Sequence, residues 1–106
     1  MNLKGYVAVG SPVPVSVQNM VVRDYCARNG HSYSLSDVEF VFGGSAMWEG
    51  IDWAKFDGVC VYSLWQIPNG AMLPEGKEVH FALENYVLPR DEEMVRTLRQ
   101  LREAIK

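Results

Sequence analysis

Several features that would assign a function are scarce or absent in this sequence. Lysine and arginine together number 10 against 13 aspartate and glutamate residues, so the net charge is −3. Proteins that hold duplex DNA usually carry a basic surface, because neutralising phosphates supplies much of their affinity. We therefore expect no DNA partner.

Cysteine is also scarce, since Cys26 and Cys60 are the only two in the chain. Two cysteines are too few for a disulfide scaffold, and we expect both to be buried, reduced thiols. No Cys-x-x-Cys pair, Cys/His cluster or nucleotide-binding fingerprint occurs, so neither a metal nor a cofactor is expected.

Long apolar runs are missing as well. No stretch approaches the ~20 apolar residues of a membrane span, and the first residues lack the apolar core of a secretory signal. The sequence thus predicts a cytoplasmic protein with no membrane partner. Its length of 106 residues fits one domain, over residues 1–106.

Short apolar runs bounded by glycine or polar residues are typical of buried strands in a parallel sheet. The predicted strands are 6–9, 31–35, 58–62 and 78–83. In the last of these, Val79, Phe81 and Leu83 alternate with Glu78 and His80, which predicts an apolar face and a polar face.

Helical spacing follows the first strand and returns at the end of the chain. Ser16 is the predicted N-cap of a helix that ends at Gly30, and 46–55 is a predicted short helix. The last helix, opening at 89–93, carries a stripe of apolar residues predicted to face the core: Met94, Leu98, Leu101 and Ile105. This order of elements predicts a small doubly wound α/β fold with a mostly parallel four-stranded sheet flanked by helices.

Ligands of such folds bind beyond the carboxyl ends of the strands. Polar or aromatic residues of the segments expected there, or on the polar face of the fourth strand, are the candidate ligand-binding residues: Ser11, Ser16, Gln18, Asn19, Ser63, Trp65, Gln66, His80 and Glu84. None of them forms a recognisable nucleophile–base pair, so the catalytic residues, if there are any, are not identified by the sequence.

Six of these candidates also have a plainer interpretation. Ser11 and Ser16 flank a helix N-terminus suited to an anion, but serine is an ordinary capping residue. Ser63 and Gln66 either meet a ligand or are the polar end of a strand, and Trp65 either stacks on a ligand or packs under its loop. His80 and Glu78 are either an acid–base pair or a surface or core pair of a sheet.

Three segments are similar to the catalytic domain of the serine recombinases, which has a resolvase-like fold: 5–9 (GYVAV), 22–26 (VRDYC) and 57–64 (DGVCVYSL). That family carries an arginine and a nucleophilic serine at the first strand, where this chain has Ala8 and Gly10. The family's phosphate-clamping arginines correspond to Gln66 and Asn69. Phosphoryl transfer to DNA needs a nucleophile and concentrated positive charge, so recombinase activity is excluded.

The chain more closely resembles a small bacterial family, the sporadic carbohydrate cluster proteins. Segments 16–26 (SVQNMVVRDYC), 57–64 and 78–84 (EVHFALE) carry this resemblance, whereas 43–56 is shorter than the family's helix there. The family occurs among genes for surface-polysaccharide or unusual-sugar synthesis, so the resemblance implies a setting but no catalytic residues.

Three functions remain open at this point. The first is a small enzyme or ligand-binding protein acting on a sugar or nucleotide sugar, and the sequence favours it slightly. The second is a non-catalytic interaction module that pairs with itself or with a biosynthetic enzyme, suggested by Phe40, Phe42, Trp48, Trp53 and the amphipathic last helix. The third, a residual nucleic-acid binder, follows from the fold resemblance alone. A homodimer is expected under either of the first two.

Overall fold

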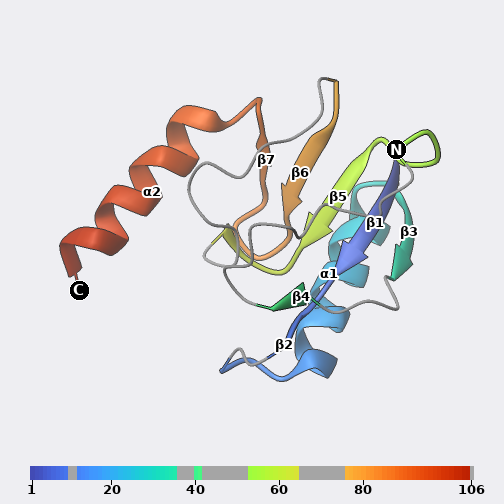
Figure 1. Cartoon of the computed structure of the whole chain (residues 1–106), viewed down its shortest axis with the longest axis horizontal. Coiled ribbons are helices and arrows are strands. Elements are labelled where there is room, and N and C mark those ends of the chain that lie inside the picture. The colour runs from blue at the N-terminus through green and yellow to red at the C-terminus, as the bar shows by residue number, and fades with distance from the viewer. Residues whose placement is uncertain (10–11, 36–39, 42–52, 65–75, 106) are drawn as a thin grey trace.

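The computed structural model describes residues 1–9, 12–35, 40–41, 53–64 and 76–105. Its main sheet has five strands in the order β3-β1-β5-β6-β7 (Figure 1). In chain order these are β1 (Asn2–Tyr6), β3 (Ser32–Leu35), β5 (Gly58–Val61), β6 (Glu78–Phe81) and β7 (Tyr86–Leu88). The first four are parallel to their neighbours, and β7 runs antiparallel to β6. A separate parallel pair joins β2 (Ala8–Val9) to β4 (Phe40–Val41).

The predicted α/β class is confirmed, but the main sheet is five-stranded and mixed rather than four-stranded. The strand missing from the prediction is β7, which has only three residues and therefore no usable alternation. It follows β6 through the turn at residues 82–85, where Asn85 has a φ of 61°. Left-handed backbone of this kind suits asparagine and reverses the chain sharply.

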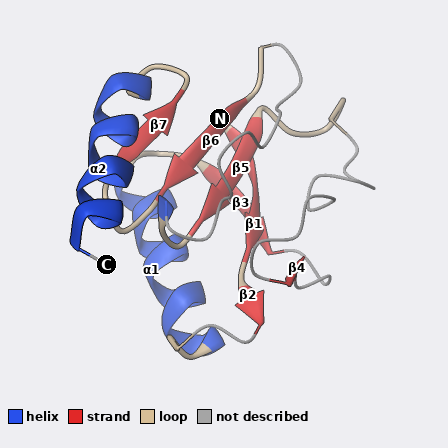
Figure 2. Cartoon of the chain, turned by 60° about the vertical axis from the view of Figure 1, so that its left-hand side comes forward, coloured by secondary structure: helices blue, strands red, loops and turns tan. Residues whose placement is uncertain are grey.

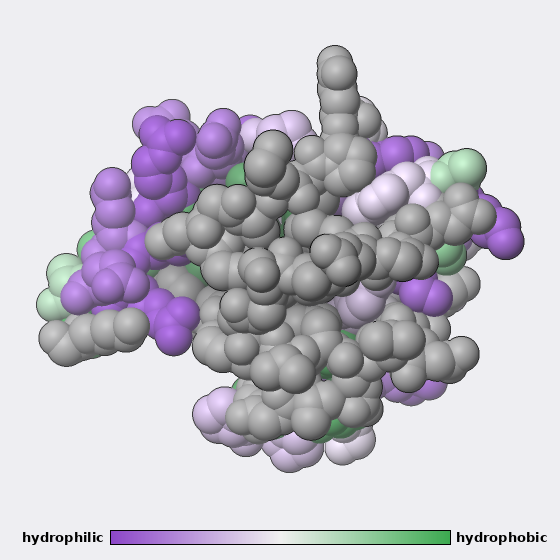
Figure 3. Space-filling view, in the orientation of Figure 1, coloured by the Kyte–Doolittle hydropathy of each residue, from purple (hydrophilic) through white to green (hydrophobic). Residues whose placement is uncertain are grey.

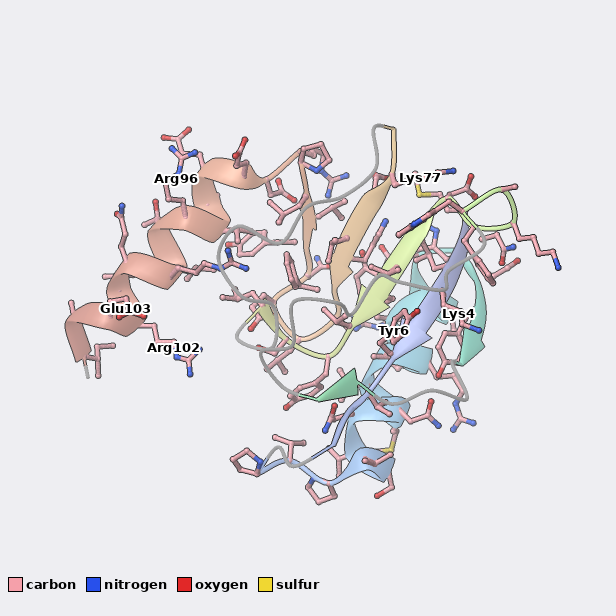
Figure 4. All side chains as sticks on the ribbon, viewed as in Figure 1. Lys4, Tyr6, Lys77, Arg96, Arg102 and Glu103 are labelled. Carbon is pink, nitrogen blue, oxygen red and sulfur yellow. The ribbon has the colours of Figure 1, made fainter. Side chains whose placement is uncertain are left out.

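The first strand was also predicted in the wrong place. The segment 6–9 does not form one central strand, because β1 ends at Tyr6 and Ala8–Val9 pairs with β4 instead. The charged Lys4 and the adjacent Gly5 interrupt the apolar pattern of β1, so the sequence does not indicate this strand. The side chain of Lys4 extends from β1 (Figure 4), and its ammonium lies 5.4 Å from the centre of the Phe56 ring. A side chain on Gly5 would collide with the ring of Tyr33.

Helix α1 (Val15–Arg28) confirms the predicted helix but not its predicted cap. The N-cap is Pro14, which makes no side-chain capping bond, so Ser16 lies inside the first turn and is exposed. The proline carbonyl accepts the backbone N–H groups of Val17 (3.0 Å) and Gln18 (3.1 Å). At the other end Gly30 has a φ of 71°, as expected of a glycine that ends a helix.

The sheet is packed on both faces by two separate clusters. Helix α1 lies against one face, where its Val22, Tyr25 and Cys26 contact residues of the strands (Figure 1). The opposite face carries a wholly apolar cluster built from alternating residues of β1, β5 and β6: Tyr6, Val59, Val61, Val79 and Phe81. Trp53 and Val95 pack against this second cluster, so the predicted inward position of Trp53 is confirmed.

Helix α2 (Glu92–Ile105) runs beside β7 at the edge of the sheet (Figures 1 and 2). Its predicted apolar stripe does not face the core, because Met94, Leu101 and Ile105 are 48, 54 and 82 % exposed. Val95 is buried instead, and Leu98 is half-buried. Charged residues cover the outer side of the helix (purple in Figure 3), and Arg96 extends away from the sheet (Figure 4).

No helix within the described ranges is both long and apolar enough to cross a membrane.

Candidate functional site

Two of the predicted site residues, Ser63 and Glu84, meet at the carboxyl end of the parallel strands. The Ser63 hydroxyl donates a hydrogen bond to Oε2 of Glu84 (2.7 Å). The other carboxylate oxygen, Oε1, accepts the backbone N–H of Leu64 (3.1 Å). Ser63 is buried, whereas Glu84 is partly exposed. The carboxylate is thus held at both oxygens while it still reaches the surface.

The local fold explains why these two residues come together. Ser63 follows the end of β5, and Glu84 lies in the turn that follows β6, which is the neighbouring strand. The turn is fastened to the end of β5 by two backbone bonds, from Ala82 N to Val61 O (2.9 Å) and from Leu83 N to Tyr62 O (2.8 Å). A bond from Asn85 N to Phe81 O (2.8 Å) closes the turn on itself.

This arrangement is suited to binding rather than to nucleophilic catalysis. A serine nucleophile needs a base that takes its proton and a reacting group within reach. Ser63 donates to a carboxylate, which is a weak base, and its side chain is only 2 % exposed. A carboxylate offers about four acceptor positions, so Glu84 retains acceptor capacity beyond the two donors described.

Two of the other described candidates at this edge, Gln18 and Asn19, have structural partners. Gln18 is buried and its Nε2 donates to the carbonyl oxygen of Val13 (2.9 Å), which holds the segment before α1 against the helix. The Tyr33 hydroxyl donates to Oδ1 of Asn19 and so links α1 to β3. Ser16 is exposed on the first turn of α1.

The remaining candidates of the predicted site fall outside the described ranges. These are Ser11, Trp65 and Gln66. Most of the predicted helix 46–55 also falls outside them, as do Phe42 and Trp48.

His80 was predicted on a polar face, and this prediction is wrong. The side of β6 that carries His80 is covered by α1, and His80 is only 3 % exposed. Its Nδ1 is 2.7 Å from the hydroxyl oxygen of Tyr25, a buried hydrogen bond. Among the described residues its Nε2 has no hydrogen-bond partner, and this atom lies 3.6 Å from Oε1 of Glu78. The rings of His31 and His80 meet edge to face, with centroids 5.0 Å apart.

Burial keeps His80 and Tyr25 neutral near pH 7. Desolvation, with a smaller effect of the charges of His31 and Arg90, lowers the pKa of His80 to about 4. Burial is also the main cause that raises the pKa of Tyr25 to about 12. When the tyrosine O–H donates to Nδ1, the imidazole proton is on Nε2 and faces Glu78. His80 therefore belongs to the core and not to the carboxyl edge.

Sequence reasoning missed the Tyr25–His80 pair. Tyr25 fits the apolar side of its helix, but His80 was placed on the polar face of its strand, and 55 residues separate the two along the chain. It also missed that the backbone N–H of Leu64 would hold Glu84. Almost every residue has such an N–H group, so the identity of the residue gives no signal. Within the described ranges, no group of three or more His, Cys, Asp or Glu side chains is placed to hold a metal ion.

No protein-family model, curated protein or solved structure matches this chain.

Proposed function

We propose that this chain binds a sugar or nucleotide sugar at the carboxyl edge of its sheet, in bacterial surface-carbohydrate biosynthesis. The observation that carries the proposal is the carboxylate of Glu84, fixed by Ser63 and Leu64 and partly exposed. Sugar hydroxyls are hydrogen-bond donors, and a carboxylate that is already oriented loses little entropy when it accepts them. The biosynthetic setting is what the resemblance to the sporadic carbohydrate cluster proteins implies.

The position of the carboxylate supports the same proposal. Glu84 follows β6, and α1 begins at the same edge of the sheet (Figure 1). Ligands of α/β folds bind at this edge, beyond the carboxyl ends of the strands. Among the described residues around Glu84 no side chain is an activated nucleophile, which favours a binding role over covalent catalysis.

Binding is tested by titrating the protein with nucleoside diphosphate sugars and sugar 1-phosphates in a calorimeter. We expect Glu84→Gln to weaken binding by roughly 10- to 100-fold, because a hydrogen bond to a charged group contributes about 1.5–3 kcal/mol. Ser63→Ala should weaken it less, since it releases only one of the two donors that orient the carboxylate.

Glu78→Gln is the matched control. Glu78 is the first residue of β6, the strand that precedes the turn with Glu84, and it lies at the opposite edge of the sheet. Its affinity should equal that of the unmodified protein. Equal weakening by Glu78→Gln and Glu84→Gln, or no binding of any compound, would contradict the proposed site.

The second candidate function is an interaction module that pairs with another copy of the chain. One of its supports is weaker in the structure, because Trp53 packs against the core. The exposed Met94, Leu101 and Ile105 of α2 still favour it. Sedimentation equilibrium distinguishes the two candidates: a concentration-dependent dimer that Leu101→Glu disrupts supports the module, and a monomer throughout excludes self-pairing.

A further inference from the structure

The proposed ligand site does not use the two cysteines, although both lie at one interface. Cys26 belongs to α1 and Cys60 to β5, and their side chains are 1 and 0 % exposed. Both are part of the cluster that joins α1 to the sheet. Two free thiols from different elements therefore share one buried layer.

The strand register explains why they meet. On the face covered by α1, Cys60 stands in one cross-strand row, between Gly5 of β1 and His80 of β6. The Tyr25 hydroxyl reaches His80 (2.7 Å), so the last turns of α1 lie over this row. Cys26 follows Tyr25 in the helix, and it belongs with Cys60 to the buried cluster that joins α1 to the sheet.

We propose that Cys26 and Cys60 form a reversible disulfide that fastens α1 to the central strand of the sheet. The two cysteines come from opposite sides of the interface where α1 packs on the sheet, so a bond between their sulfur atoms would join the helix to β5. The proposal does not rest on the proposed ligand site, because neither cysteine contacts Ser63 or Glu84 through any hydrogen bond described above.

The two thiols differ in acidity, and this difference sets the order of the reaction. The hydrogen bond from Cys60 lowers the pKa of Cys26, and the same bond, together with burial, raises the pKa of Cys60. The thiolate is the reactive form, so Cys26 is the attacking sulfur and Cys60 the resolving sulfur.

With a peroxide as the oxidant, the reaction has two balanced steps. The Cys26 thiolate attacks one peroxide oxygen, the O–O bond breaks, and hydroxide leaves and takes a proton, giving water and a sulfenic acid on Cys26. The sulfur of Cys60 then attacks the sulfur of Cys26, the S–O bond breaks, and a second water leaves. Two thiols are oxidised by two electrons, and the peroxide is reduced to two water molecules. A dithiol reductant reverses the bond by exchange.

Burial makes the reaction depend on opening of the interface. Peroxide reaches Cys26 only when the end of α1 moves away from the sheet, so oxidation should be slow in the native protein and faster when α1 is loosened. Once formed, the bond closes the loop between α1 and β5, which should raise the midpoint of thermal unfolding by roughly 10 °C.

The test treats the purified full chain with hydrogen peroxide and measures its intact mass, its free thiols after denaturation and its unfolding midpoint. We expect a loss of two hydrogens, no remaining free thiol, a peptide that joins Cys26 to Cys60, and a higher midpoint, all reversed by dithiothreitol. Three results would overturn the proposal: unchanged thiols, oxygen added to Cys26 without a cross-link, or dimers linked through either cysteine.

Single variants give the controls. Cys26→Ser and Cys60→Ser should each leave one thiol and show no rise in midpoint after peroxide. Because Cys60 is wholly buried, Cys60→Ala is a second variant in case the hydroxyl prevents folding. The cross-link and mass of the unmodified protein decide the question even when neither Cys60 variant folds.

Discussion

The two helices of this protein contradict the expectation that the more amphipathic helix is the better buried. Helix α1 has an irregular pattern, yet Gln18, Val22, Tyr25 and Cys26 are buried. Helix α2 carries apolar residues at regular helical spacing, yet within it only Val95 is buried. The difference lies in what each helix connects, and not in its own sequence.

Helix α1 must cross the sheet, because it links two parallel strands, β1 and β3. A crossover lies over the face of the sheet, so even its polar Gln18 is enclosed and finds a backbone acceptor. Helix α2 follows the antiparallel strand β7, which is the edge strand of the described sheet, so the helix lies beside the sheet and not across its face. Periodicity therefore identifies the apolar side of a helix, while chain topology decides whether that side is covered.

The largest expected effect concerns Tyr25 and His80, the polar pair buried under α1. The pKa of His80 is about 4 in the folded protein, below its ordinary value of 6.5. Between these two pH values the unfolded chain binds a proton that the folded chain does not. The contribution of His80 to the free energy of unfolding is therefore fully present above pH 6.5. It is lost as the pH falls to 4, by at most about 3 kcal/mol. Urea unfolding at a series of pH values measures this decrease.

The variant His80→Gln should remove most of that decrease, because glutamine keeps a polar partner for Tyr25 but does not titrate. His31→Gln is the control, since His31 is less buried and should contribute a smaller part. Identical pH profiles for the unmodified protein and His80→Gln would show that another group causes the acid sensitivity.

The next effect in size compares matched truncations in the two helices. Val22→Ala in α1 should cost about 2 kcal/mol, because Val22 is fully buried and its methyl groups would leave a cavity. The free energy of unfolding from urea titration at pH 7 checks this value. A cost below about 0.5 kcal/mol would mean that α1 is not packed against the sheet as described.

The smallest effect is expected in α2. Leu101→Ala should change the free energy of unfolding by no more than about 0.5 kcal/mol, although it removes more apolar surface than Val22→Ala, because Leu101 is half exposed. The same urea titration serves, at a protein concentration low enough to keep the chain monomeric. A cost as large as that of Val22→Ala would indicate that the apolar stripe of α2 is covered in solution.

Much of the fold could be predicted from short patterns. Apolar patterns and the glycine or polar residues that bound them indicated three elements. These are residues 58–61 of the predicted strand 58–62, the predicted strand 31–35 apart from its first residue, and the helix that ends before Gly30. The strand 78–83 was found too, although it ends at Phe81 and Leu83 is exposed. The first strand was predicted at 6–9 instead of Asn2–Tyr6, because Lys4 and Gly5 interrupt its apolar pattern, and β7 was missed because it is too short.

The candidate site could be predicted only in part. Placing Ser63 and Glu84 at one edge required no more than the order of the strands, and the structure brings these two side chains together. His80 could not be placed, because alternation shows that it opposes Val79 but not that α1 covers its face. Its burial depends on Tyr25, which is distant in sequence and near only after folding.

The sequence by itself determined the α/β class, the central strand and which residues alternate on each face. These follow from local sterics and from the periods of helix and strand, which act over a few residues. The tertiary structure alone decided that Cys26 and Cys60 share one buried cluster, that His80 is enclosed and that most of the stripe of α2 stays exposed. Such outcomes depend on which surfaces the chain brings together, and contacts between distant residues have no local signature.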